Sequence, residues 1–142
     1  YSRIVNGRNP IVAHEYLGSS VEGKDVFIAD DIISSGESML DIAYALKKQN
    51  AGRIFAYATY AIFTNGLEAF DKAYKEGYIS GVLGSNLTYR TPELREREWF
   101  FEVDVSKYIA YFIAALNHDI SVSTIIDPHE KIEQLLKKRG QR

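Results

Sequence analysis

Apolar strand-like runs alternate with helix-like stretches along this chain, and that order constrains the fold more than any other feature. In the helix-like stretches apolar residues recur three and four positions apart, as at Met39, Ile42 and Leu46. Strands that alternate with helices predict a parallel sheet with right-handed crossovers, flanked by helices, which is an α/β fold. The expected strands are 25–29, 53–63, 79–87 and 98–105, and the expected helices are 67–77, 106–119, 129–140 and one that begins at Ser35 or Gly36.

A further strand-like run, Ile11–Leu17, precedes these elements. The run Asp25–Ala29 is continuously apolar after its first residue, which is typical of a strand buried on both faces. The whole chain, residues 1–142, is short enough to form one domain. It begins with Tyr1 rather than methionine, so we expect a piece of a longer protein or a chain with a trimmed end.

Charge and residue content exclude several classes of protein. A net charge of -2 gives no basis for a nucleic-acid or membrane partner. The sequence has no cysteine, which excludes disulfides and thiolate ligands and fits a reducing cytoplasm. No apolar run approaches the roughly 20 residues that a membrane span needs. The three histidines lack the spacing of metal ligands, so no metal site is assigned to them.

The segment VFIADDIISSGESML (26–40) carries the residues best suited to bind a ligand. The first amides of a helix lack partners and carry partial positive charge, so a phosphate is stabilised there. The adjacent carboxylates suit the vicinal hydroxyls of a sugar or a hydrated Mg²⁺. The pattern predicts a sugar-phosphate site; the alternative is that the acids only provide polarity at the helix entry and the serines only cap the helix. The predicted site residues are Asp30, Asp31, Ser34, Ser35, Gly36, Glu37 and Ser38.

The same segment resembles the phosphoribosyl pyrophosphate motif of type I phosphoribosyltransferase folds. That motif consists of an apolar strand, two acidic residues, two apolar residues and a loop of hydroxyls and glycine. The resemblance implies that Asp30 and Asp31 bind ribose hydroxyls and that residues 34–38 wrap the 5-phosphate. Glu37 stands where glycine is common, so its side chain must point away from the phosphate.

Longer stretches resemble the C-terminal half of ribose-phosphate pyrophosphokinases. Tyr60 and Ala61 depart from that family, because they stand where histidine and glycine are usual. The resemblance implies that residues 1–142 are the half that binds ribose 5-phosphate in a two-domain protein with a phosphoribosyltransferase-like fold, which assembles into homo-oligomers. The stretches are NPIVAHEYLGSSVEGKDVFIADD (9–31), ALKKQNAGRIFAYATYAIFTNGLEAF (45–70) and VDVSKYIAYFIAALNHDISVSTIID (103–127).

The implied enzyme is a cytoplasmic transferase of nucleotide biosynthesis. It transfers the diphosphoryl group of ATP to ribose 5-phosphate, with Mg²⁺ as cofactor, and gives phosphoribosyl pyrophosphate and AMP. The family's N-terminal half supplies most of the ATP contacts, and its basic catalytic arm lies ahead of Tyr1. We therefore expect this chain alone to orient substrate with little turnover, with Asp30 and Asp31 reaching Mg²⁺ only through water.

Two other functions share the motif. A nucleobase phosphoribosyltransferase needs a hood over the base, and the sequence offers no candidate for one. A non-catalytic domain that senses phosphoribosyl pyrophosphate or a nucleotide would keep the loop and lack catalysis. Formation of AMP from ATP and ribose 5-phosphate distinguishes the synthetase from both.

Overall fold

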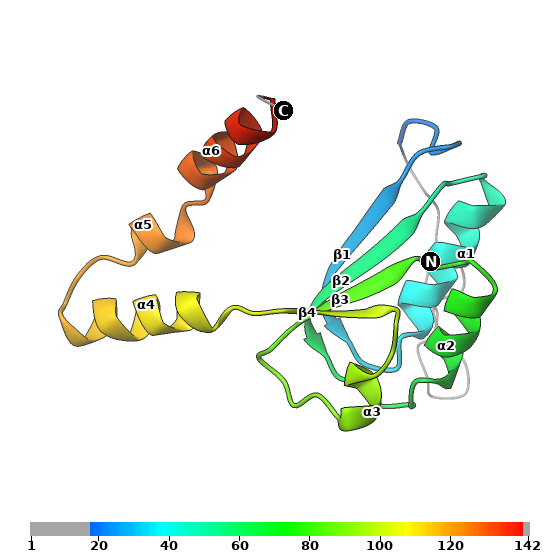
Figure 1. Cartoon of the computed structure of the whole chain (residues 1–142), viewed down its shortest axis with the longest axis horizontal. Helices are drawn as coiled ribbons and strands as arrows, with labels where there is room; N and C mark the ends of the chain where they lie inside the picture. Colours follow the sequence, from blue (N-terminus) through cyan, green and yellow to red (C-terminus); the bar gives the residue numbers. More distant parts are fainter. Residues whose placement is uncertain (1–17, 141–142) are drawn as a thin grey trace, which may run out of the picture. The chain divides into compact units, whose positions relative to one another are not determined.

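The computed structural model describes residues 18–140, and the chain divides into two compact units between Val103 and Asp104. The predicted strand Ile11–Leu17 lies outside the described residues. The first unit contains, in chain order (Figure 1), β1 (Val26–Ile33), α1 (Glu37–Lys48), β2 (Ile54–Ala61), α2 (Glu68–Lys75), β3 (Gly81–Ser85), α3 (Pro92–Arg95) and β4 (Phe100–Val103).

The four strands of the first unit form one parallel sheet in the order β1-β2-β3-β4. Val26 of β1 pairs with Ile54 of β2, and Val82 of β3 pairs with Phe100 of β4. Because every neighbour is parallel, the carboxyl ends of all four strands lie along one edge. The predicted α/β fold with a parallel sheet is confirmed.

The core lies between the sheet and the helices α1 and α2, which lie together on one side of it (Figure 1). The alanines of β2 and Ala73 of α2 are fully buried, and their small side chains leave room for large rings nearby. The Phe70 ring stacks on Trp99 at 5.5 Å between centroids and meets the Phe63 ring edge-on at 5.0 Å. Phe63, Phe70, Trp99 and Phe100 form what we call the aromatic cluster.

The opposite face of the sheet is open in the described part of the first unit, so the prediction that the first strand is buried on both faces is wrong there. The Phe27 side chain of β1 is 60% exposed, although it stacks on Tyr57 of β2. Phe101 of β4 is 47% exposed. The physical reason is that, within residues 18–103, the two long helices α1 and α2 both pack on the other face.

The helix α3 is an element that the sequence patterns do not predict. Its start is fixed by Thr91, whose hydroxyl accepts a hydrogen bond from the Leu94 amide at 3.2 Å. Pro92 occupies the first turn, where its missing N–H costs no hydrogen bond. Because α3 has only four residues, it shows no helical period in the sequence.

The second unit contains α4 (Ser106–Asn117), α5 (Ser123–Ile126) and α6 (His129–Gly140). Ser106 is the first residue of α4 and not its cap; its amide donates to the Asp104 carboxylate at 2.9 Å. α4 buries Ala115, while its large apolar residues Ile113 and Leu116 stay exposed within the described chain. None of the helices in the described part of the chain has the length and apolar character to cross a membrane.

Candidate functional site

The predicted acidic pair lies inside β1 and not after it. The strand continues past Ala29 to Ile33, because Ile32 and Ile33 still pair with β2. Both carboxylates are exposed to solvent. Adjacent side chains of a strand point to opposite faces, so Asp30 and Asp31 are directed apart.

A hollow of about 140 Å³ lies where β1 leads into α1, and we call it the β1 hollow. It brings together five of the seven predicted site residues, from the strand, the connecting turn and the first turn of the helix. Asp31 and Glu37 are not among the residues that line it. Its lining residues are Asp30, Ile32, Ile33, Ser34, Ser35, Gly36, Ser38 and Met39.

Backbone amides at the start of α1 add donors to the β1 hollow. Gly36 is the N-cap, and its carbonyl accepts the first helical hydrogen bond, from Leu40 at 3.0 Å. The amide of Glu37 donates a long bond of 3.4 Å to the Ser35 hydroxyl. Within residues 18–140 no hydrogen bond reaches the amides of Ser38 and Met39, so the partial positive charge of the helix start is directed at the hollow.

Both the turn and the packing of the core require a glycine at position 36. Its φ of 84° lies in the left-handed region, which residues with a Cβ adopt at a cost. A Cβ at this position would also collide with the ring of Phe70 in the aromatic cluster. The glycine therefore lets the turn lie directly on the core, so this end of the hollow is rigid.

The loop after β2 is tied to the β1 hollow through Thr64, which contacts Ser34 but does not itself line the hollow. The amide of Thr64 donates to the Ser34 carbonyl at 2.9 Å, and their hydroxyls lie 3.5 Å apart. The amide of Ile62 donates to the Ile33 carbonyl at 2.9 Å. The sequence signal for Thr64 is its place just after the next parallel strand, since neighbouring strand ends share an edge.

The β1 hollow combines donors with one acidic acceptor. Serine hydroxyls and helix-start amides can bind the oxygens of a phosphate. The Asp30 carboxylate accepts the Asp31 amide at 2.8 Å, which orients it, and it keeps further acceptor capacity for a hydroxyl. Such an arrangement can hold a phosphorylated polyol.

The described residues offer a limited place for a metal ion. No three histidine, aspartate or glutamate side chains of the described chain converge as metal ligands. Mg²⁺ usually keeps several waters and binds through one or two carboxylates together with substrate phosphates. Asp30, at the mouth of the β1 hollow, fits that limited role, and a cage made only of protein ligands does not fit.

Comparison with known proteins shows which proteins this chain resembles in sequence. No family model matches it. It is 29% identical over 111 residues to the ribose-phosphate pyrophosphokinase of Vibrio cholerae and 30% identical over 111 residues to that of Vibrio parahaemolyticus, covering 78% of this chain and 34% of each relative. The Pyrococcus furiosus protein of the same name is 42% identical over 64 residues, which are 44% of this chain and 23% of that protein.

A solved structure agrees with this. The phosphoribosylpyrophosphate synthetase of Mycobacterium smegmatis superimposes with a TM-score of 0.62 over 72% of this chain and 33% of its own, at 19% identity. The chain therefore has the α/β fold of the phosphoribosylpyrophosphate synthetases. By sequence it is a divergent relative of the ribose-phosphate pyrophosphokinases, and it spans about a third of the length of the curated relatives it matches.

Proposed function

We propose that residues 1–142 form the ribose 5-phosphate-binding, C-terminal domain of a ribose-phosphate diphosphokinase. The 5-phosphate occupies the β1 hollow and accepts hydrogen bonds from Ser34, Ser35 and Ser38 and from the first amides of α1. The ribose hydroxyls contact Asp30, which lines the hollow, while a contact with Asp31 stays a prediction because its side chain is directed to the other face of β1. The observation that carries the proposal is the β1 hollow itself, where hydroxyls, unpaired amides and one carboxylate meet.

In this proposal the chain orients one substrate, and other parts of a longer protein supply the rest. ATP, an N-terminal half with a basic arm and Mg²⁺ complete a cytoplasmic, oligomeric transferase. Mg²⁺ would neutralise charge on the transferred diphosphoryl group, and Asp30 would reach the ion through water. Glu37 is exposed and does not line the β1 hollow, which agrees with the requirement that its charge avoid the phosphate.

Calorimetric titration of the whole chain with ribose 5-phosphate tests the binding site. Asp30→Asn should weaken binding about tenfold, because a hydrogen bond to a charged acceptor contributes about 1.5–3 kcal/mol. Asp41→Asn is the matched control, since Asp41 is an exposed carboxylate of α1 that does not line the hollow. No binding by the unaltered chain, or equal affinities of the two variants, contradicts the proposal.

Catalysis is tested separately, in the two-domain protein that this proposal implies. Formation of AMP from ATP and ribose 5-phosphate supports the diphosphokinase. Tight binding of phosphoribosyl pyrophosphate or a nucleotide without any AMP formation would instead support a non-catalytic sensing domain. A base-dependent release of pyrophosphate from phosphoribosyl pyrophosphate would support a nucleobase phosphoribosyltransferase.

A further inference from the structure

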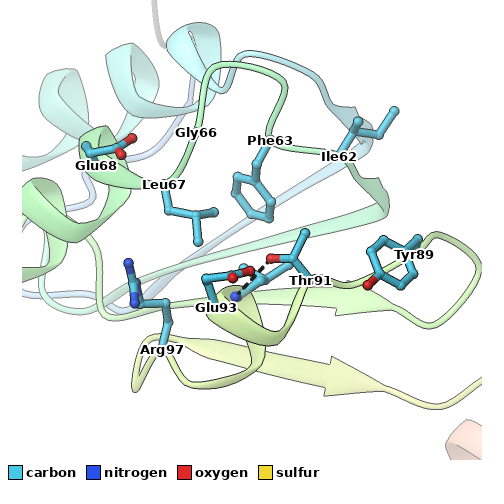
Figure 2. A pocket seen from close by; sticks show the side chains of 10 residues that line it. Ile62, Phe63, Gly66, Leu67, Glu68, Tyr89, Thr91, Glu93 and Arg97 are labelled. Atoms are coloured by element: carbon cyan, nitrogen blue, oxygen red, sulfur yellow. Dashed lines mark hydrogen bonds between the residues drawn. The ribbon is translucent and has the colours of Figure 1, made fainter.

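A second hollow, of about 290 Å³, lies at the same carboxyl edge and has different chemistry (Figure 2). One wall is the loop after β2, residues 62–68, and the other is the segment 89–97 around α3. The Phe63 and Leu67 side chains point into the space above Thr91 and Glu93 (Figure 2). We call it the Phe63 hollow, and nothing in the proposed binding of ribose 5-phosphate uses it.

The first wall of the Phe63 hollow is held in place from several sides. Phe63 has a φ of 53°, which is unfavourable for an aromatic residue and persists only where the surroundings enforce it. Its ring packs against Phe70 and Trp99, and its amide lies 3.2 Å from the Ile33 carbonyl. The amide of Gly66 closes the loop by donating to the Phe63 carbonyl at 3.0 Å.

The second wall is equally fixed. The guanidinium of Arg97 donates to the Asp71 carboxylate at 3.1 Å, and the same carboxylate accepts the Trp99 indole N–H at 2.7 Å. The charge of Arg97 is therefore already paired. The hydroxyl of Thr91 caps the first turn of α3. A hollow between two rigid walls is formed before a ligand arrives, which lowers the entropic cost of binding.

The rim of the hollow favours hydrogen-bond donors. Hydrogen bonds from its own backbone amide and from the Thr91 hydroxyl, together with the charge of Arg97, lower the pKa of Glu93, which favours the ionised carboxylate. Glu68 contributes a second carboxylate, close to Gly66. Because Asp71 balances the charge of Arg97, the carboxylates of Glu68 and Glu93 leave the rim with an excess of hydrogen-bond acceptors, which suits an amino group.

The mouth of the hollow carries an exposed aromatic ring. The Tyr89 side chain is 82% exposed, the largest exposed fraction among the large apolar and aromatic side chains of the described chain. Tyr89 lies beyond Thr91, at one end of the group of lining side chains (Figure 2). A planar ligand could stack on this ring while its body contacts Phe63 and Leu67.

We propose that the Phe63 hollow binds a planar heteroaromatic ring that carries an exocyclic amino group. The ring stacks on Tyr89 and lies over the apolar floor, and the amino group donates to the Glu93 carboxylate. The volume suits a ligand of one or two fused rings. The chemistry is that of an amino-substituted nucleobase.

Titration of the whole chain with nucleosides, followed by amide NMR shifts of Gly66 and Leu94, tests this site. Adenosine and inosine differ in the amino group, as do cytidine and uridine. Adenosine should bind about tenfold more tightly than inosine, because a good hydrogen bond to a charged group contributes about that factor. Cytidine should likewise bind more tightly than uridine. Equal binding within both pairs, or no saturable shift with adenosine, overturns the proposal.

Variants of the lining residues test whether adenosine binds in the Phe63 hollow. Tyr89→Ala should weaken adenosine binding about tenfold, as loss of a stacking platform does, whereas Tyr89→Phe should keep it. Glu93→Gln should remove the preference for adenosine over inosine. Tyr60→Ala is the matched control, since Tyr60 is another exposed tyrosine and does not line the hollow. Equal losses in Tyr89→Ala and Tyr60→Ala contradict the proposal, and circular dichroism of each variant confirms that it is folded.

Discussion

The β1 hollow and the Phe63 hollow lie at the same edge of one sheet, yet they offer opposite chemistry. The first presents hydroxyls and unpaired amides that suit an anion, and the second presents rings and carboxylates that suit an aromatic donor. The first is built within one stretch of sequence, residues 30–39, while the second joins two stretches that are more than 20 residues apart. A local turn thus defines one site, and a long-range contact defines the other.

The two hollows nevertheless share a support in the aromatic cluster. Phe70 lies against Gly36 on one side and against Phe63 on the other. Gly36 lines the β1 hollow and Phe63 lines the other. Substitutions in the cluster should therefore affect both hollows together, and substitutions in a single wall should affect only one.

The largest effect is expected from Phe70→Ala, which removes the shared support. The ring is fully buried, so its loss should lower the free energy of unfolding by about 3–5 kcal/mol and weaken ligand binding at both hollows. Phe27→Ala is the control, because that ring is mostly exposed and its loss should cost about 0.5 kcal/mol or less. Urea unfolding measures both. If Phe70→Ala weakened ligand binding at only one hollow, the inference that Phe70 supports both hollows would be wrong.

The second largest effect is expected from Gly36→Ala, which should lower stability and disturb mainly the β1 hollow. The left-handed conformation alone costs an L-residue about 1–2 kcal/mol, and displacing the Phe70 ring adds to this. Gly77→Ala separates the two causes, since Gly77 has a similar φ of 78° and open space around it. Thermal unfolding should show a larger loss for Gly36→Ala than for Gly77→Ala. Equal losses of stability in the two variants would mean that the Phe70 ring moves aside without a cost in free energy.

Ser38→Ala should affect binding at the β1 hollow and leave stability nearly unchanged. Its hydroxyl lines the hollow, and loss of a hydrogen bond to a phosphate should weaken ribose 5-phosphate binding about tenfold. Ser123→Ala, at an exposed serine of the second unit, is the control. Adenosine binding at the Phe63 hollow should be the same in both variants. A loss of adenosine binding in Ser38→Ala would show that the hollows are not independent.

The smallest effect is expected from Glu37→Gln. Glu37 is exposed beside the β1 hollow, so removing its charge should tighten ribose 5-phosphate binding only about two- to fivefold, in the range of exposed charge pairs. The gain should disappear at high salt, which screens exposed charges. Glu98→Gln, another exposed glutamate, should leave the affinity unchanged. If the tighter binding of ribose 5-phosphate persisted at high salt, the Glu37 carboxylate would have to lie inside the hollow.

The sequence predicted the local parts of this molecule well. Apolar runs and helical spacing gave the alternation of strands and helices, and Gly36 marked the start of α1. Five residues of the predicted motif line the β1 hollow because they lie close together in the chain. The binding roles of Asp31 and Glu37 remain predictions, and neither residue lines that hollow.

What the sequence determined by itself is the order of elements and the turn that leads into α1, because spacing and glycine conformation act within a few residues. Only the tertiary structure decided that β1 runs through Asp30 and Asp31, since pairing with β2 extends the strand. It also decided that Gly36 rests on Phe70 and that residues 62–68 face 89–97. These features depend on contacts between residues far apart in the chain, which local patterns do not encode.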